Sequence, residues 1–294
     1  MGMDIVEYSH LDVRGRLHAS KSSSERIKII SKDVWFECSQ GAAIINLAKR
    51  YSSLSDVSPA PCNVIVGEGG YGKTSIIRQI EKRSKDWPGS VRFLSMSNNP
   101  GNLRFNELLL VALGLPRQAG SSRHKKELFP SELAKFIEHS GIKVLVIDEI
   151  HDAIGRNKTE QHHSLALLKA LSEFPYCLSV IAFGTRLAGN ALSLDEQLYR
   201  RYDPIVLRRW ERGAEFTDFL HSWAVNLPLR NTTDVKDKAL IKYILDQTNG
   251  EMDRVVKLIK WGAIQAVVGG EERLTKEVMA RGLVERWGFR LDDD

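Results

Sequence analysis

Short hydrophobic runs alternate with helical patterns through the middle of the chain. The runs have the length and apolar character of buried strands, and they lie at residues 63–66, 91–96, 143–147, 178–183 and 205–207. Between them the residues follow helical patterns. Strands that alternate with helices predict a parallel sheet covered by helices on both faces. We therefore expect an α/β fold.

The pattern changes on either side of this region. A helix is predicted over 34–51, followed by a stretch rich in Ser and Pro. After Trp210 the strand-like runs end, and amphipathic helices are predicted over 213–226, 235–248, 251–268 and 275–286. The sequence thus predicts an irregular N-terminal arm or linker (1–33), an α/β domain (34–210) and a small helical domain with a short acidic tail (211–294).

Composition narrows the class of protein. Of the 294 residues, 43% are hydrophobic and 27% are charged, which excludes a chain that is disordered throughout. The apolar runs are too short to span a membrane, and the N-terminus lacks the apolar segment of a secretory signal. Three widely spaced cysteines without a CxxC pair fit a reduced cytoplasm. The formal net charge of +5 permits a polyanionic partner.

A glycine-rich loop follows the first strand-like run. Residues 67–74 match the phosphate-binding pattern G-x-x-x-x-G-K-[ST] at every fixed position. Glycines let the backbone wrap a phosphate, and the helix that follows directs its positive end at the anion. Lys73 would reach the β- and γ-phosphates, and the Thr74 hydroxyl would bind Mg²⁺. The expected nucleotide-binding residues here are Gly67, Glu68, Gly69, Gly70, Tyr71, Gly72, Lys73, Thr74 and Ser75.

Two carboxylates end the buried run at 143–147. In a parallel sheet, such residues lie at the carboxyl edge, where ligands bind. Asp148 is therefore a candidate Mg²⁺ residue, and Glu149 a candidate group to orient or deprotonate the attacking water. An Asp-Glu pair at a strand end is also typical of an ordinary helix cap. Its combination with an intact phosphate loop favours the catalytic interpretation.

The order of the runs separates subclasses of nucleotide-binding proteins. A strand-like run at 91–96 lies between Lys73 and Asp148, so we expect that the loop strand and the acidic strand are not sheet neighbours. This arrangement, with the adjacent Glu149, resembles the additional-strand, catalytic-glutamate class of P-loop ATPases. No Asn-Lys-x-Asp guanine motif occurs, which favours ATP over GTP.

Four further residues are candidates for sensing the nucleotide. Thr185 follows the run at 178–183, after Gly184, and has a hydroxyl that suits the γ-phosphate or the attacking water; a plain turn is the alternative. Arg200 and Arg201 precede the last run and suit the role of an arginine finger, or else of a surface ion pair. Arg254 begins a helix of the small domain, where it would close onto the γ-phosphate or remain solvated.

These residues, in this order, resemble the AAA+ ATPases, and most of all the TniB/TnsC/MuB group of transposition target-selection proteins. The resemblance rests on the loop at 67–74, the run Val146–His151, Phe183-Gly184-Thr185, the box at 197–202 and Gly250–Arg254. At one position the sequence departs from the commonest AAA+ pattern, and for the arginine finger it offers two adjacent candidates. Thr185 stands where Asn is common, and of the two arginines we favour Arg201 because it immediately precedes the aromatic of the box.

The resemblance implies a P-loop AAA+ core followed by a helical lid. It also implies an ATPase of the bacterial cytoplasm that forms rings or helical filaments on duplex DNA without sequence preference. Such an assembly recruits a DDE-type transposase, works with a target-selector protein in some systems, and is released after hydrolysis. Pore-facing cations would then contact DNA phosphates. The candidates are Arg104, Lys125, Lys126, Arg156 and Lys158, each of which is equally typical of plain surface.

Two other classes share parts of this pattern. A STAND-type signalling NTPase has a similar loop but usually carries repeat or effector domains. A replication helicase loader or initiator shares the ATPase core, and an initiator would carry a DNA-reading module. Neither addition is evident in this sequence, so an ATP-dependent switch in transposition is the favoured hypothesis.

Overall fold

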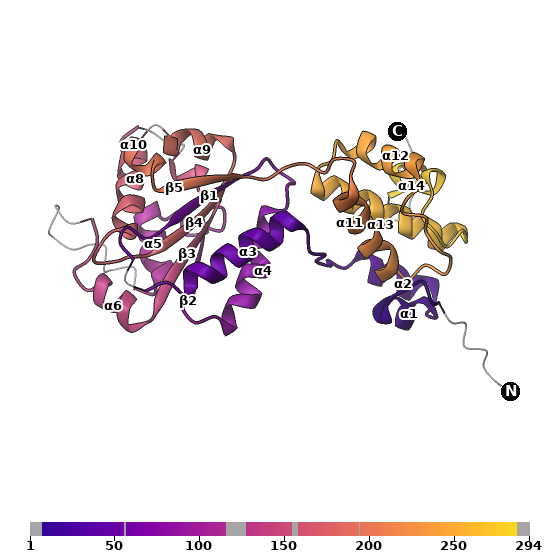
Figure 1. The fold of residues 1–294 in the computed structure, drawn as a ribbon, viewed down its shortest axis with the longest axis horizontal. Coiled ribbons are helices and arrows are strands. Elements are labelled where there is room, and N and C mark those ends of the chain that lie inside the picture. Colours follow the sequence, from indigo (N-terminus) through magenta and orange to yellow (C-terminus); the bar gives the residue numbers. More distant parts are fainter. Residues whose placement is uncertain (1–7, 56, 116–127, 155–157, 194, 287–294) are drawn as a thin grey trace. The chain divides into compact units, whose positions relative to one another are not determined.

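The structure is a computed structural model that describes residues 8–55, 57–115, 128–154, 158–193 and 195–286. The chain divides into two compact units, Gln40–Arg208 and Met1–Ser39 with Arg209–Asp294. We call them the sheet unit and the helical unit and describe each by itself (Figure 1).

Five parallel strands form the sheet of the first unit, in the order β2-β3-β4-β1-β5. They are β1 (Cys62–Val66), β2 (Ser90–Ser95), β3 (Ile142–Asp148), β4 (Ser179–Gly184) and β5 (Tyr202–Val206). The predicted parallel sheet is confirmed. The loop strand β1 and the acidic strand β3 are not neighbours, as expected. The strand between them is β4, however. The strand β2, which corresponds to the run at 91–96, lies at the lateral edge of the sheet.

Helices cover both faces of this sheet (Figure 1). They are α3 (Ser39–Ser52), α4 (Lys73–Arg83), α5 (Phe105–Leu113), α6 (Leu133–His139), α7 (His151–Ile154), α8 (Lys158–Ser172), α9 (Arg186–Ser193) and α10 (Glu196–Tyr199), with a 3-10 turn at Ser84–Asp86. The helix predicted over 34–51 begins at Ser39 instead. Residues before Ser39 belong to the helical unit, where the ring centroid of Phe36 lies 4.8 Å from that of Trp223.

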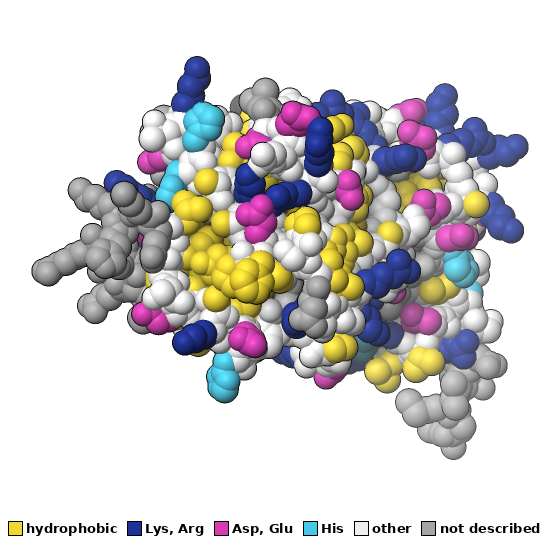
Figure 2. Space-filling view, turned by 60° about the vertical axis from the view of Figure 1, so that its left-hand side comes forward, with side chains coloured by type: hydrophobic (Ala, Val, Ile, Leu, Met, Phe, Trp, Pro, Cys, Tyr) yellow, Lys and Arg dark blue, Asp and Glu magenta, His cyan; other side chains and the backbone are white. Residues whose placement is uncertain are grey.

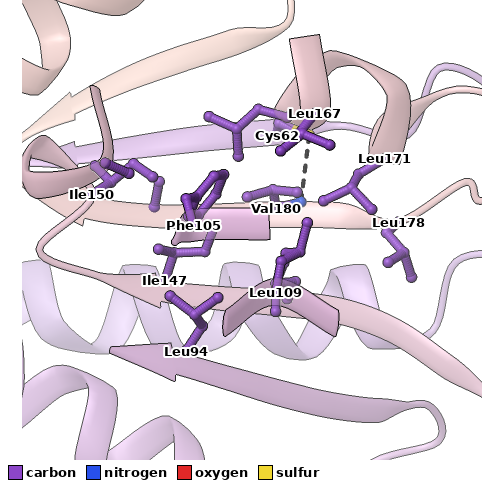
Figure 3. Close-up of a cluster of buried hydrophobic side chains, with 14 of the residues drawn as sticks. Cys62, Leu94, Phe105, Leu109, Ile147, Ile150, Leu167, Leu171, Leu178 and Val180 are labelled. Carbon is purple, nitrogen blue, oxygen red and sulfur yellow. Dashed lines mark hydrogen bonds between the residues drawn. The ribbon is translucent and has the colours of Figure 1, made fainter. Parts of the chain in front are cut away.

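Alternation along the strands divides the sheet's hydrophobic residues between two layers. Cys62, Val64 and Val66 of β1 face a core shared with α5 and α8 (Figure 3). There the Val180 amide donates to Cys62 Sγ at 3.4 Å. On the opposite face, Tyr51 of α3 donates its hydroxyl to Asn63 Oδ1 at 2.5 Å. Because both faces are covered, β1 and β4 are buried along their whole length.

The helical unit packs around a row of aromatic rings. Its C-terminal helices are α11 (Ala214–Asn226), α12 (Lys238–Thr248), α13 (Met252–Gly269) and α14 (Lys276–Val284), close to the predicted positions. Trp210 stacks on Phe219 with ring centroids 4.7 Å apart, and Phe219 meets Trp223 edge-on. The side chains of α13 that face these rings are buried with them in a single cluster.

The N-terminal segment is not the irregular arm that its polar composition suggested. Residues 13–31 form two helices, α1 (Val13–Ala19) and α2 (Ser23–Ser31), in the helical unit. Arg26 is only 1% exposed and binds both carboxylate oxygens of Glu272, at 2.6 and 2.7 Å. Its Nη1 also donates to the carbonyl of Pro228 at 3.0 Å. The anchoring partner is 246 residues away, so no local pattern indicated it.

In the part of the chain that the structure describes, no helix is both long enough and apolar enough to cross a membrane.

Removing one side of this buried ion pair leaves the other charge without its partner. We expect Arg26→Met to lower the free energy of unfolding by about 3–5 kcal/mol in a urea titration at pH 7. Arg14→Met is the matched control, because Arg14 is exposed on α1. We expect that variant to stay within about 0.5 kcal/mol of the wild type.

The same pair makes stability depend on acid pH. Burial alone would raise the pKa of Glu272, but hydrogen bonds from Arg26 and the Arg230 amide outweigh it, so the pKa is lowered. The stabilisation is therefore complete above the unfolded pKa of about 4.3 and is lost as pH falls through the folded pKa. The wild type should lose more stability than Arg26→Met between about pH 5 and pH 3. Equal losses in both proteins would contradict this role.

Candidate functional site

The glycine-rich loop connects the end of β1 to the first turn of α4. Gly70 and Gly72 have φ of 80° and 87°, values that a side chain disfavours, so glycine is needed at both bends. A Cβ on Gly67 would lie 3.2 Å from Leu207, which leaves little space for one. The Gly67 amide donates to the Gly184 carbonyl at 3.0 Å, which ties the loop to β4.

Lys73 lies inside this loop. It is 6% exposed, and its Nζ donates to the carbonyls of Gly67 at 2.7 Å and Glu68 at 3.1 Å. Thr74 and Ser75 follow it in the first turn of α4 and are exposed. The loop thus presents a lysine ammonium, a threonine hydroxyl and a helix N-terminus at one place, which suits phosphate oxygens.

The two predicted carboxylates stand at the carboxyl end of β3. Glu149 has φ of 55°, a strained value for a residue with a side chain, and its amide donates to Asp148 Oδ1 at 3.0 Å. Burial and the neighbouring charge of Glu149 raise the pKa of Asp148. The Glu149 side chain is 29% exposed, so water reaches it, and its Oε2 lies 3.1 Å from His151 Nδ1.

Thr185 lies at the end of β4, between the strands that carry the other groups. Its Oγ1 is buried and has no hydrogen-bond partner among the described residues. Gly184, which precedes it, has no room for a side chain: a Cβ there would lie 2.8 Å from Ala188 Cβ of α9 and 3.0 Å from Ile150 Cγ2. An unused buried hydroxyl is costly, which makes Thr185 a candidate for contact with a ligand.

Arg200 and Arg201 lie at the amino ends of the strands, whereas the loop lies at their carboxyl ends. Tyr202, which follows them, pairs with Cys62 at the start of β1, whereas Val206 pairs with Val66, where the loop begins. The length of a five-residue strand, about 13 Å, therefore separates the arginines' backbone from the loop. Their side chains do not join the loop and the carboxylates in one site of this copy.

The two arginines have different surroundings. Arg201 is only 20% exposed and binds its own subunit, with Nη2 2.7 Å from Glu173 Oε1 and Nη1 3.4 Å from Ser172 Oγ. Arg200 is 74% exposed and pairs with Glu196 one helical turn earlier. No local pattern indicated Glu173 as the partner, since it lies 28 residues before Arg201 on another connection.

The remaining candidates are distributed over both units. Arg254 belongs to the helical unit, where its Nε lies 2.9 Å from Glu251 Oε2. Arg104 and Lys158 are exposed at the starts of α5 and α8. Arg104 also borders a cavity of about 310 Å³ lined by Thr159 and His163 of α8. Lys125, Lys126 and Arg156 lie outside the described residues.

Comparison with known protein families identifies the family of this chain. The profile of the family described as Bacterial TniB protein matches residues 26–212, more than half of the sequence. This chain belongs to the TniB family. The matched range runs from Arg26 through the phosphate loop, both carboxylates and the arginine pair.

Solved structures show which fold this TniB-family chain has. The Aeropyrum pernix ORC2 protein, solved in ADPNP and ADP complexes, is similar with a TM-score of 0.59 and 16% identity over 87% of this chain and 70% of that one. The A. pernix ORC1 protein in complex with DNA has a TM-score of 0.56 and 16% identity, over 88% of this chain and 69% of that one. Drosophila ORC bound to DNA has a TM-score of 0.57 and 15% identity, over 91% of this chain and 66% of that one. The fold is that of the AAA+ ATPases.

One curated protein is similar in sequence. The chaperone protein ClpB of Rickettsia felis is 28% identical over 206 residues, which cover 63% of this chain. The match spans about a fifth of that protein, 21% of its length. Family and fold together class the TniB-family chain as a P-loop ATPase of the AAA+ type.

The buried Thr185 hydroxyl allows stability and function to be separated. Thr185→Val keeps the shape of the side chain and removes a polar atom that has no partner among the described residues, so we expect an unchanged or slightly higher melting temperature. If the hydroxyl contacts the reacting groups, ATP turnover, followed by phosphate release, should fall about tenfold. Thr185→Ser is the control that keeps the hydroxyl. Full turnover by the valine variant would exclude a role for Thr185 in hydrolysis.

Proposed function

We propose that this TniB-family chain hydrolyses ATP to control its own assembly on duplex DNA, and that the assembly marks a target for a DDE-type transposase. The observation that carries the proposal is the meeting of three strand ends at one sheet edge: the loop with Lys73, the Asp148-Glu149 pair and Thr185. Membership of the TniB family supports the link to transposition.

The residues at this edge fit a nucleotide with Mg²⁺. The loop has a lysine inside it, and the Thr185 hydroxyl is buried beside it at the end of the neighbouring strand. In the described ranges no group of three His, Cys, Asp or Glu side chains is placed to hold a metal ion. A threonine hydroxyl and a carboxylate at this edge suit Mg²⁺, which protein sites usually bind through one or two carboxylates together with substrate phosphates. Thr74 and Asp148 would hold the ion.

Each side chain then has a defined task. Lys73 binds the β- and γ-phosphates, and bound Mg²⁺ would neutralise phosphate charge. Glu149 accepts the proton of the attacking water, which its exposed carboxylate can reach. Thr185 donates its hydroxyl to the γ-phosphate or orients the water.

The arginine finger acts between copies. Because the arginines lie at the far edge of the sheet from their own loop, a phosphate that either one reaches belongs to another molecule. We assign this task to Arg200, although its neighbour Arg201 was favoured from the sequence. Arg201 is engaged by Glu173 and Ser172, and withdrawing it would break those contacts, whereas Arg200 is exposed.

Contacts with DNA are expected from cations near the start of α8. Lys158 is exposed in the first turn of that helix, and Arg104 borders the cavity lined by the helix. Both are placed to bind phosphates without reading bases, which fits sequence-independent binding. A target-selector protein and the transposase are further partners that the family suggests. A helicase loader or initiator would share the fold, and sequence-independent assembly on DNA is the property that separates the proposals.

Replacing Glu149 with glutamine tests the proposed cycle. Glu149→Gln keeps the size of the side chain but cannot accept the proton, so we expect ATP binding within about threefold of wild type and hydrolysis at least a hundredfold slower. Sedimentation with long duplex DNA should then show assemblies that persist after ATP is added. Normal hydrolysis by this variant would refute the role of Glu149.

Lys73→Ala is the companion control for binding. It should lose ATP affinity in calorimetry and fail to assemble. If the wild-type protein itself showed no affinity for ATP with Mg²⁺, or assembled on DNA equally well without nucleotide, the proposed function would be wrong.

The two arginines are distinguished by comparing single variants. Arg200→Ala should keep the wild-type melting temperature and ATP affinity but lose assembly-dependent hydrolysis, because only the contact with the next copy is removed. Arg201→Ala should lower the free energy of unfolding by about 1–2 kcal/mol, because it leaves Glu173 and Ser172 without their partner. The reverse pattern in a thermal scan and a phosphate-release assay would assign the finger to Arg201.

A further inference from the structure

The carboxylate of Glu149 has a close neighbour that the proposed function leaves without a role. His151, the first residue of α7, places its Nδ1 3.1 Å from Glu149 Oε2. Histidine side chains also lie at separate places on the surface drawn in Figure 2, so an imidazole by itself does not indicate catalysis. His151 differs from a surface histidine because its side chain is only 24% exposed and lies against a candidate general base.

The backbone around Glu149 is fixed, whereas its side chain needs a further contact. The Ile150 amide donates to the Phe183 carbonyl at 2.9 Å, which ties this segment to the end of β4. The Asp152 amide donates to the Glu149 carbonyl at 3.0 Å and closes a turn at the start of α7. A glutamate side chain on such a backbone still rotates about its own bonds. A second group must therefore hold the carboxylate if it is to keep one direction.

His151 is placed to supply this contact. Its Nδ1 is buried and, apart from Glu149, has no hydrogen-bond partner among the described residues. A buried ring nitrogen without a partner is costly, so a proton on Nδ1 is best directed at the glutamate oxygen. On the other side of the ring, Nε2 lies 3.8 Å from Asp152 Oδ1, which attracts a proton on that nitrogen. The imidazole thus lies between two carboxylates of its own segment.

We propose that His151 is a positioning residue for ATP hydrolysis, which holds Glu149 Oε2 through Nδ1 so that Oε1 faces the attacking water. The proposal rests on the proposed function, because it needs Glu149 to accept the proton of that water. A donor on one carboxylate oxygen restricts rotation and leaves the lone pairs of the other oxygen available. The water oxygen bonds to the γ-phosphorus as the bond to the ADP oxygen breaks, and the water proton passes to Glu149. His151 keeps its own proton.

Two other roles for the contact have different kinetic consequences. If His151 held the carboxylate away from the water, its removal would accelerate hydrolysis. If it only stabilised the start of α7, its removal would lower the melting temperature and leave turnover by the folded protein unchanged. Positioning fits the contact better, because the donor and the carboxylate share one short segment with a fixed backbone and meet without any movement.

His151→Phe tests the contact, because it keeps a planar ring and removes both nitrogens. We expect kcat for phosphate release to fall at least tenfold, while KM and the calorimetric affinity for ATP with Mg²⁺ stay within about twofold of wild type. His162→Phe is the matched control. His162 is exposed on α8, so the same replacement there should leave kcat at the wild-type value.

A matched pair of smaller side chains tests the donor itself. His151→Asn keeps an N–H donor near the position of Nδ1, so its kcat should lie within about threefold of wild type. His151→Leu has nearly the shape of the asparagine variant but no donor, and it should be as slow as His151→Phe. A thermal scan shows which variants are folded, and the leucine variant replaces the phenylalanine variant if the latter is not.

A double variant tests whether His151 acts through Glu149. In the Glu149→Gln background the proton acceptor is already absent, so adding His151→Phe should slow single-turnover hydrolysis by no more than about twofold. A further tenfold loss would show that His151 affects the reaction by another route and would overturn the proposal.

The outcomes separate this inference from the proposed function. If Glu149→Gln is inactive but folded His151→Phe hydrolyses ATP at the wild-type rate or faster, the positioning role is wrong and the ATPase cycle stands. If His151→Asn is as slow as His151→Leu, the donor is not what matters and the inference is overturned. If Glu149→Gln itself hydrolyses ATP at the wild-type rate, the proposed function fails.

Discussion

The candidate site depends on the fact that all five strands run in the same direction. Parallel strands bring all their carboxyl ends to one edge, so the loop after β1, the carboxylates after β3 and the hydroxyl after β4 meet although they are spread over more than a hundred residues. The sheet order 2-3-4-1-5 places β4 between the other two strands. Thr185 therefore lies between the phosphate loop and the acidic pair.

The same constraint separates the candidate arginines from the phosphate loop. The residues before β5 are at the amino edge, a full strand length from the phosphate loop of their own copy. An arginine placed there can complete a site only in a neighbouring molecule. In the proposed assembly, catalysis and assembly would be coupled by geometry, because a chain without a neighbour would lack the arginine that completes its site.

The helical unit depends on contacts between segments that are far apart in the sequence. Its described helices come from both ends of the chain, and the buried pair of Arg26 and Glu272 links the N-terminal helices to the connection after α13. Two buried charges are costly unless they are paired and further hydrogen bonds compensate for their burial. Here Arg26 also binds the Pro228 carbonyl, and Glu272 accepts from the Arg230 amide, so the segment is held in one position.

The sequence by itself determined the parts that local pattern controls. Strand-like runs, amphipathic helices and the order of the loop and carboxylates were all readable, because hydrophobic periodicity and the phosphate motif are properties of neighbouring residues. Tertiary structure decided what depends on contacts between distant residues. It placed β4 rather than β2 beside the loop strand, folded residues 13–31 onto a partner more than two hundred residues away, and bound Arg201 to Glu173 while leaving Arg200 exposed. Such pairings are set by burial and hydrogen bonding across the fold, and no spacing along the chain encodes them.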